Sequence, residues 1–513
     1  MKKLFIVFLI IIALPIAQIV SLVIINLEIP QSIDLNTFNS NNNSNLKYLS
    51  RNIKISSSYN AQDYIGLHQS LWDKSLTGNN ITVAVIDTGI YKNHSAFTND
   101  GKLNWSDRII KYFDVITNTS DMPRDNNGHG TWVASILGGN CTEYQGVAPS
   151  VNLIVLRIFD AGGETNVSIF ENAINWILRY KDLYNIKIVS MSFGAKPELD
   201  NLFQIAYLQQ IVRKLVDDGI FVVAAGGNDG DPSQSEGDRT INSPASDKKV
   251  LAVGGVDYNG YMYQLSSGGP SYEFTKKPDV CAPAVNILGA DIGFPNDYTF
   301  RSGTSGATPF VAGLAALMLE KKDTLTPMEL KNIISLTSYK TINPRIVQDN
   351  IQGWGIIQGY AALESLNSPV LINTSSNLSL SLTQNYTVLC LPIRLKPNYY
   401  YLELVQLDSI QAEMYLYKMT PNEYGIPNLV SDTLNELVQY NKAKRMGIFT
   451  DLEQNYYLVV KSIQRGSGNF LIRLVVDYRN LVFLFIFGVS ITFLVYIGKL
   501  NFNLIKRRKE SIL

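Results

Sequence analysis

The sequence predicts an α/β fold, a parallel sheet with helices on both faces, followed by a small C-terminal antiparallel β-sandwich and a C-terminal transmembrane helix. Apolar strands alternate with helical stretches between residues 81 and 256, which is typical of strand–helix–strand units. Between residues 366 and 478 helical periodicity fades, and short alternating runs separated by turn residues indicate the sandwich. Residues 481–498 carry no charge and are long enough to cross a bilayer.

The first domain is expected to alternate strictly between strands and helices. Helices are expected over Ser168–Tyr180 and Leu202–Asp217. The expected strands cover residues 81–86, 152–158, 186–192, 220–225 and 250–256. Functional groups in such folds gather at the carboxyl ends of the strands, and Asp87 directly follows the first of them.

Two further helices are expected near the end of this domain. Small apolar residues on all sides of the stretch after Ser305 predict a fully buried helix, with Pro309 in its first turn. The run Thr326-Pro327-Met328-Glu329 predicts a capping box at the start of the next helix. The domain is expected to close near residues 353–362.

The sandwich is predicted from five short runs in which apolar residues alternate with polar ones. They cover residues 386–391, 399–405, 412–417, 456–460 and 470–476.

Both ends of the chain are predicted to meet a membrane. Lys2-Lys3 precede an apolar run over residues 4–25, which fits either a cleaved signal peptide or an uncleaved anchor. The basic cluster at residues 506–509 predicts a cytoplasmic C-terminus and an extracytoplasmic body, although a buried helix or strand pair is the alternative for residues 481–498.

These features divide the chain into six segments. They are a signal peptide or N-terminal anchor (1–26), a polar spacer (27–58), the α/β domain (59–365), the sandwich (366–478), the transmembrane helix (481–498) and a basic cytoplasmic tail (499–513). The expected location is the cell membrane, with one or two passes.

Composition narrows the classes of partner. Lys+Arg and Asp+Glu are both 44, and this zero net charge argues against a nucleic-acid partner. The three cysteines fit either one disulfide, such as Cys141–Cys390, or three free thiols. Glycosylation acceptor sequences fit an extracytoplasmic surface and begin at Asn42, Asn80, Asn93, Asn104, Asn118, Asn140, Asn166, Asn373, Asn377 and Asn385.

Three short runs carry the candidate chemistry. Asp87 lies in Ile86-Asp87-Thr88-Gly89, His129 in Gly128-His129-Gly130-Thr131, and Ser305 in Gly303-Thr304-Ser305-Gly306. A serine hydroxyl becomes nucleophilic when a histidine removes its proton and a carboxylate orients that histidine. The three residue types therefore predict a nucleophilic hydrolase.

In these runs, and in the order Asp, His, Ser, the chain resembles the subtilases, a family of subtilisin-like serine endopeptidases, over about residues 60–365. The resemblance implies a subtilisin-like sheet in which Ser305 is the nucleophile, His129 the base and Asp87 its orienter. Asn228, at the end of Phe221–Asn228, would donate its amide to the oxyanion beside the Ser305 N–H.

The resemblance also implies the substrate-binding segments. Ser192-Phe193-Gly194 and Ala225-Gly226-Gly227 would flank an extended substrate backbone and form the walls of the primary pocket. Asn242-Ser243-Pro244 would lie near the pocket floor, which then lacks an acidic group and favours apolar or neutral side chains. Protein or peptide substrates are implied.

The chain departs from the subtilase pattern at several places. Trp132 stands where a second histidine is usual, and Gly306 stands where a methionine commonly follows the nucleophile. The segment 27–58 is too short and polar for the usual folded propeptide, which leaves the activation route open. His94 matches a common subtilase position and has either a supporting role near the cleft or a plain surface role.

No cofactor is expected to be required. The sequence contains no metal-ligand motif such as His-Glu-x-x-His, although the resemblance allows structural calcium held by loop oxygens. Two rival functions are a binding scaffold on an inactive protease fold, and a sandwich that acts mainly as an adhesion or substrate-docking module.

Overall fold

The structure is a computed structural model. It describes residues 57–67, 75–98, 108–120, 122–141, 144–198, 200–230, 240–372, 375–383, 387–408, 410–433, 443–463 and 468–476. The predicted N-terminal segment, most of the spacer, the transmembrane helix and the basic tail lie outside these residues. Within them, no helix is both long and apolar enough to cross a membrane.

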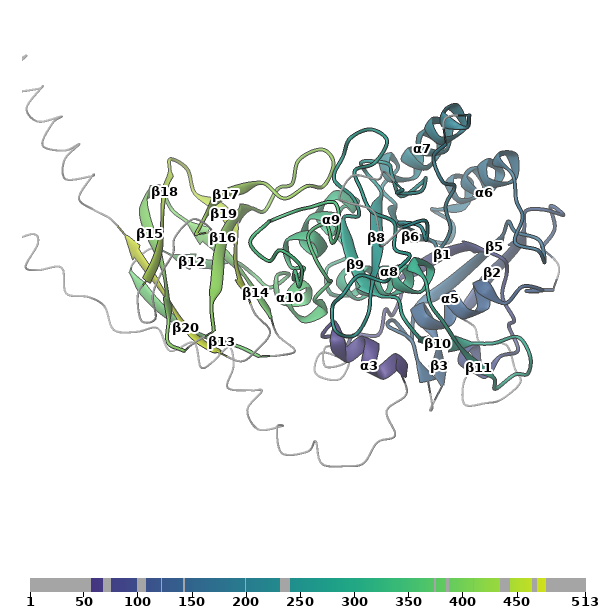
Figure 1. Cartoon of the computed structure of the whole chain (residues 1–513), viewed down its shortest axis with the longest axis horizontal. Coiled ribbons are helices and arrows are strands. Elements are labelled where there is room, and N and C mark those ends of the chain that lie inside the picture. The colour runs from purple at the N-terminus through teal and green to yellow at the C-terminus, as the bar shows by residue number, and fades with distance from the viewer. Residues whose placement is uncertain are drawn as a thin grey trace, which may run out of the picture.

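The α/β domain is built on a seven-stranded sheet with the strand order β2-β5-β1-β6-β7-β8-β9 (Figure 1). All neighbouring strands of this sheet are parallel. The strands are β1 Thr82–Asp87, β2 Ile109–Asp114, β5 Asn152–Arg157, β6 Ile186–Met191, β7 Phe221–Ala225, β8 Leu251–Val256 and β9 Val280–Pro283. The five predicted strands are confirmed, whereas β2 and β9 were missed.

Alternate side chains of each strand enter two different cores, one on each face of the sheet. Val83 and Val85 of β1 pack in the core that holds α5 (His129–Gly138) and α8 (Thr304–Lys321). Ala84 and Ile86 pack in the core that holds α6 (Val167–Tyr180) and α7 (Leu202–Asp217). The prediction of helices on both faces is therefore confirmed.

The helices behave largely as their sequences predict. Thr326 and Glu329 form the predicted capping box of α9 (Pro327–Leu336). The position of Pro309 was predicted wrongly: α8 begins at Thr304, so Pro309 lies in its second turn, where its missing N–H leaves a helical carbonyl without its usual partner. The remaining elements are α3 Ser57–Tyr64, the 3-10 helix η1 Ser95–Phe97, α10 Gly359–Glu364, and two hairpins, β3 Asn140–Cys141 with β4 Tyr144–Gln145 and β10 Ile287–Ala290 with β11 Tyr298–Arg301.

The C-terminal domain consists of two sheets, ordered β12-β14-β19-β16-β17 and β13-β20-β15-β18. Its strands are β12 Val370–Ile372, β13 Ser376–Leu382, β14 Val388–Leu395, β15 Asn398–Gln406, β16 Ala412–Lys418, β17 Leu429–Asp432, β18 Ala443–Thr450, β19 Gln454–Ser462 and β20 Gly468–Val476. The pairing is antiparallel except between β12 and β14, which run parallel. The five predicted strands correspond to β14, β15, β16, β19 and β20.

One face of the sandwich continues the core of the α/β domain. On β16, Met414 and Leu416 point into the sandwich, whereas Tyr415 and Tyr417 belong to the core cluster of the α/β domain. The same alternation holds on β19, where Val459 joins that cluster and Leu458 does not. The two domains therefore share apolar packing.

The cysteines are free thiols. Cys281 and Cys390 are buried and Cys141 is partly buried, and no pair of them is bridged. The alternative of three free thiols is thus the one that the structure supports.

Candidate active site

Asp87 and His129 meet at the carboxyl end of β1. Nδ1 of His129, the first residue of α5, donates to Oδ1 of Asp87 at 2.7 Å. Asp87 is 1% exposed, and its Oδ1 also accepts from the backbone N–H of Thr88 at 2.7 Å. Burial lowers the pKa of His129, but the charge and hydrogen bond of Asp87 outweigh it, so the pKa lies above 6.5.

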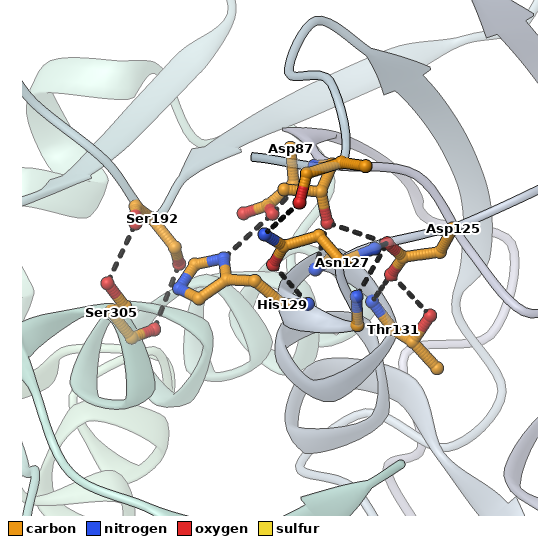
Figure 2. Close-up of polar contacts among 11 residues, drawn as sticks. Asp87, Asp125, Asn127, His129, Thr131, Ser192 and Ser305 are labelled. Atoms are coloured by element: carbon orange, nitrogen blue, oxygen red, sulfur yellow. Dashed lines mark hydrogen bonds and ion pairs between the residues drawn. The ribbon is translucent and has the colours of Figure 1, made fainter. Parts of the chain in front are cut away.

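A second carboxylate, Asp125, holds the loop that leads into α5 (Figure 2). Its Oδ1 accepts from Thr88 Oγ1 and from the backbone N–H groups of Asn127 and Gly128. Its Oδ2 accepts from the backbone N–H and the hydroxyl of Thr131 at 2.9 and 2.6 Å. Because these bonds join the β1 end to the first turn of α5, they fix His129 relative to Asp87.

Ser305 lies in the first turn of α8, and Ser192 at the end of β6 contacts it twice. The Ser305 hydroxyl donates to the carbonyl oxygen of Ser192 at 2.8 Å, and the Ser192 hydroxyl donates to the carbonyl oxygen of Ser305 at 2.9 Å. The carbonyl of Ser305 is free to accept from the Ser192 hydroxyl because its usual helical donor would be the N–H of residue 309, and Pro309 has no N–H. In the view of Figure 2, the His129 ring lies between Asp87 on one side and the two serines on the other.

Asn228 is oriented by the start of the same helix. Its Oδ1 accepts from the backbone N–H of Thr304 at 2.9 Å and from the Thr304 hydroxyl at 3.1 Å. The side-chain oxygen of Asn228 thus accepts from the first N–H of α8. The Nδ2 group of the same amide points away from Thr304. Asn228 is an exposed residue.

Trp132 and Gly306, the two departures from the family pattern, occupy adjoining space. Trp132 is 1% exposed, and its Nε1 donates to the carbonyl oxygen of Ile287 at 3.1 Å. A Cβ on Gly306 would lie 2.7 Å from Cη2 of Trp132. Residue 306 therefore has no room for a side chain while the indole stays in place.

The backbone of one predicted pocket wall, Ala225–Gly227, is hydrogen-bonded to other parts of the protein. The Gly226 N–H donates to Val253, and the carbonyls of Gly226 and Gly227 accept from Asn242 and Ser267. The side chain of Asn242 lies against both walls: a Cβ on Gly194 would be 2.7 Å from its Cβ, and a Cβ on Gly227 would be 2.6 Å from its Cγ. Asn242 is 6% exposed, and its Oδ1 has no hydrogen-bond partner among the described residues.

The remaining residues of the predicted segments lie as follows. Phe193 is partly buried and contacts Phe159 and Phe170 edge-on, with ring centroids 5.0 and 5.8 Å apart. Gly194 is exposed, and Ala225 is 2% exposed.

His94 is fully buried, so the alternative of a surface role is wrong. Its Nδ1 accepts from the N–H of Ala96, and its Nε2 donates to the carbonyl of Asp297 at 2.6 Å. Burial lowers the pKa of His94, which favours the neutral imidazole. Through its two hydrogen bonds, the ring joins the 3-10 helix η1 to the β10–β11 hairpin.

Sequence reasoning missed the parts played by Asp125, Thr131 and Ser192. Asp125 could have been noticed because it begins a run of turn-forming residues directly before His129. Among the described residues, no group of three or more His, Cys, Asp or Glu side chains could hold a metal ion.

A parallel α/β sheet with an Asp–His pair at a strand end and a serine at a facing helix N-terminus defines the class of serine hydrolases. The sequence profile of the subtilase family matches residues 78–355, more than half of the chain. The chain belongs to the subtilase family of subtilisin-like serine peptidases.

Two curated relatives and one solved structure are similar to the chain. The chain is 34% identical over 289 residues to serine protease AprX of Bacillus subtilis, covering 51% of this chain and 62% of the relative. It is 33% identical over 264 residues to subtilisin DY of Bacillus licheniformis, covering 51% of this chain and 84% of the relative. A solved cold-adapted subtilisin-like serine proteinase matches with 26% identity and a TM-score of 0.43, over 55% of this chain and 90% of that one.

Proposed function

We propose that this protein hydrolyses peptide bonds through an acyl-enzyme formed on Ser305. The observation that carries the proposal is the hydrogen bond between His129 and the buried carboxylate of Asp87, with Ser305 of α8 on the other side of the imidazole (Figure 2). Family membership supports the same reaction.

In the proposed mechanism, the Ser305 hydroxyl turns from the Ser192 carbonyl toward Nε2 of His129 when a substrate enters. His129 takes the proton as Oγ attacks the scissile carbonyl, and later gives it to the leaving amine. Asp87 keeps Nδ1 protonated and stabilises the imidazolium, which agrees with the raised pKa of His129.

The oxyanion would be stabilised from two directions. Thr304 holds the Asn228 carbonyl, so the Nδ2 group can donate to the tetrahedral intermediate together with the Ser305 backbone N–H. The positive end of the α8 dipole adds to this stabilisation. Loss of one such donor typically lowers kcat by about 100- to 1,000-fold.

We also propose that the primary pocket accepts small neutral side chains. Asn242 occupies the space between Gly194 and Gly227, and a larger side chain would have to displace it. Because the Gly226 and Gly227 carbonyls are engaged within the protein, Ala225–Gly227 would serve as a wall, while Ser192–Gly194 pairs with the substrate backbone.

The proposed location is the outer face of the cell membrane. The uncharged stretch 481–498 and the basic tail after it support an anchor with an outside body. Among the residues that the structure describes, five predicted glycosylation sites have exposed asparagines: Asn80, Asn93, Asn118, Asn166 and Asn377. Alkaline extraction and protease access to a C-terminal tag on intact cells would test this topology, and release of the protein by alkali would contradict it.

Labelling with a fluorophosphonate, followed by mass spectrometry of the modified peptide, tests the proposed chemistry. We expect modification at Ser305 in the wild-type chain and none in His129→Ala. Labelling at another residue, or equal labelling in His129→Ala, would contradict the assignment. Ser305→Ala should fold normally and show no peptide hydrolysis.

A further inference from the structure

One end of the sandwich brings together two turns and the last described residue of the chain. Asn398 pairs with Thr450 and Tyr400 pairs with Val476, so the β14–β15 turn, the β18–β19 turn and the end of β20 lie at this end. The sheet that contains β15, β18 and β20 lies on the side of the sandwich away from the α/β domain (Figure 1). We call this end the Val476 end of the sandwich.

Apolar side chains are exposed at the Val476 end. Tyr399 and Phe449 form a cross-strand pair with ring centroids 4.4 Å apart. Both rings point out of the sandwich, since the neighbouring Tyr400 and Ile448 enter its core. Phe449 is 58% exposed, and Leu452, in the β18–β19 turn, is 62% exposed. These three outward side chains, of residues 399, 449 and 452, are called the apolar tip below.

The charged side chains beside the apolar tip balance one another. Among the described residues of the two turns and the strand ends that flank them, Arg394 and Lys396 carry positive charge, Asp451 and Glu453 carry negative charge, and all four are exposed. Arg394 forms an ion pair with Glu453 at 3.7 Å. Attraction to anionic headgroups requires an excess of Lys and Arg, so the remaining contribution that this end offers to a partner is burial of apolar area.

The predicted membrane anchor begins close to this end in the chain. Residues 477–481 can extend the chain from Val476 by at most about 18 Å, even when fully stretched. Residue 481 begins the uncharged stretch that we propose as the anchor, and the headgroup layer outside the hydrocarbon core is roughly 5–7 Å thick. An anchor that starts there therefore keeps the Val476 end beside the headgroups, whatever path the connecting residues take.

We propose that the apolar tip is a membrane-contact surface, in which Phe449 and Leu452 insert into the headgroup layer and the Tyr399 ring lies at its polar boundary. The inference rests on the proposed membrane location and adds a contact made by the folded part of the protein. Phenylalanine and leucine side chains gain from burial at this depth, and tyrosine rings are enriched there. Because the sandwich shares apolar packing with the α/β domain, the contact would hold the catalytic domain in one orientation above the bilayer.

Spin labels on the full-length chain, reconstituted in neutral phosphatidylcholine vesicles, test the contact. All variants carry Ser305→Ala to prevent self-digestion and Cys141→Ser so that the remaining native thiols are buried. A nitroxide at Leu452→Cys should collide more with oxygen, which concentrates in lipid, than with a water-soluble nickel complex. The oxygen-to-nickel collision ratio should be several-fold higher there than at Leu407→Cys. Leu407 is the matched control, because it is a 44% exposed leucine that follows β15 at the opposite end of the same sheet.

A second reporter separates insertion of the apolar tip from mere tethering by the anchor. A label at Lys396→Cys, in the β14–β15 turn, reports on the Val476 end without replacing a residue of the tip. Its collision ratio should fall to the value at Leu407→Cys when Phe449→Asp and Leu452→Asp are introduced together. It should stay unchanged when Leu407→Asp is introduced instead.

The outcomes distinguish the contact surface from the membrane location on which it rests. Release of the chain from the vesicles by alkali would contradict the proposed location and the contact with it. Retention of the chain with equal collision ratios at residues 452 and 407 would overturn the contact surface alone. A ratio at Lys396→Cys that does not change with the two aspartates would overturn it as well, because tethering would then account for the position of this end.

Discussion

Replacement of Gly306 by alanine sets two effects of opposite sign against each other. Alanine is favoured over glycine inside a helix by about 1 kcal/mol, so an unhindered substitution would stabilise α8. The new Cβ, however, would lie 2.7 Å from Cη2 of Trp132, well inside the usual carbon–carbon contact. Overpacking of this kind typically costs about 1–3 kcal/mol.

The indole has little freedom to move away. Its Nε1 donates to Ile287, and a Cβ on Gly289 would lie 2.2 Å from its Cδ1, so it packs directly on the backbone of β10. We therefore place the cost near the upper end of the range and expect Gly306→Ala to lose about 1–2 kcal/mol net. Displacement of the neighbouring Ser305 should also lower kcat by about 10- to 100-fold.

Urea unfolding of four proteins, all carrying Ser305→Ala to prevent self-digestion, measures this effect. They are the parent, Gly306→Ala, Trp132→Phe and the double variant. Phenylalanine lacks the outer ring of the indole, so in that background the helix preference should dominate. The coupling free energy between the two sites should then be about 1 kcal/mol or more.

A stabilising Gly306→Ala in the parent would show that residue 306 has room for a side chain and would contradict the prediction. Equal destabilisation by Gly306→Ala in the parent and in the Trp132→Phe background would refute it as well, because the clash would then not involve the indole.

Three further predictions concern the site. His129 must be neutral to act as a base, and Asp87 raises its pKa, so kcat/KM should fall on the acid side with a midpoint above pH 6.5. In Asp87→Asn this midpoint should move to lower pH while kcat falls, and an unchanged midpoint would contradict the prediction. Asn242→Gly should raise kcat/KM by about tenfold or more for peptides with large apolar residues before the scissile bond, relative to alanine peptides; an unchanged ratio in a peptide-library assay would exclude Asn242 as the pocket plug. Asp125→Ala leaves the buried N–H and hydroxyl of Thr131 without their acceptor, so it should lower the free energy of unfolding in urea by about 1–3 kcal/mol and also lower kcat. Wild-type stability in this variant would show that the loop before α5 does not depend on Asp125.

Local signals in the sequence predicted much of the α/β domain. The strands were found because they are apolar and fully buried, and α9 because Thr326 and Glu329 form a local capping box. β18 of the sandwich was missed because Lys444, which is 3% exposed, interrupts its apolar pattern. Its buried partner Glu413 is distant in sequence, at 2.5 Å in space, and only the fold brings the two charges together.

The candidate triad could be predicted from local sequence, because Asp87, His129 and Ser305 each lie in a short run whose residue types and order are specific to one chemistry. The contacts that hold these residues depend on the folded chain. Asp125, Ser192 and Thr304 act through hydrogen bonds between elements that are far apart in the chain, and no periodicity or motif encodes such contacts. Packing likewise decided that Trp132 excludes a side chain at residue 306, since that exclusion depends on two helices lying within van der Waals distance.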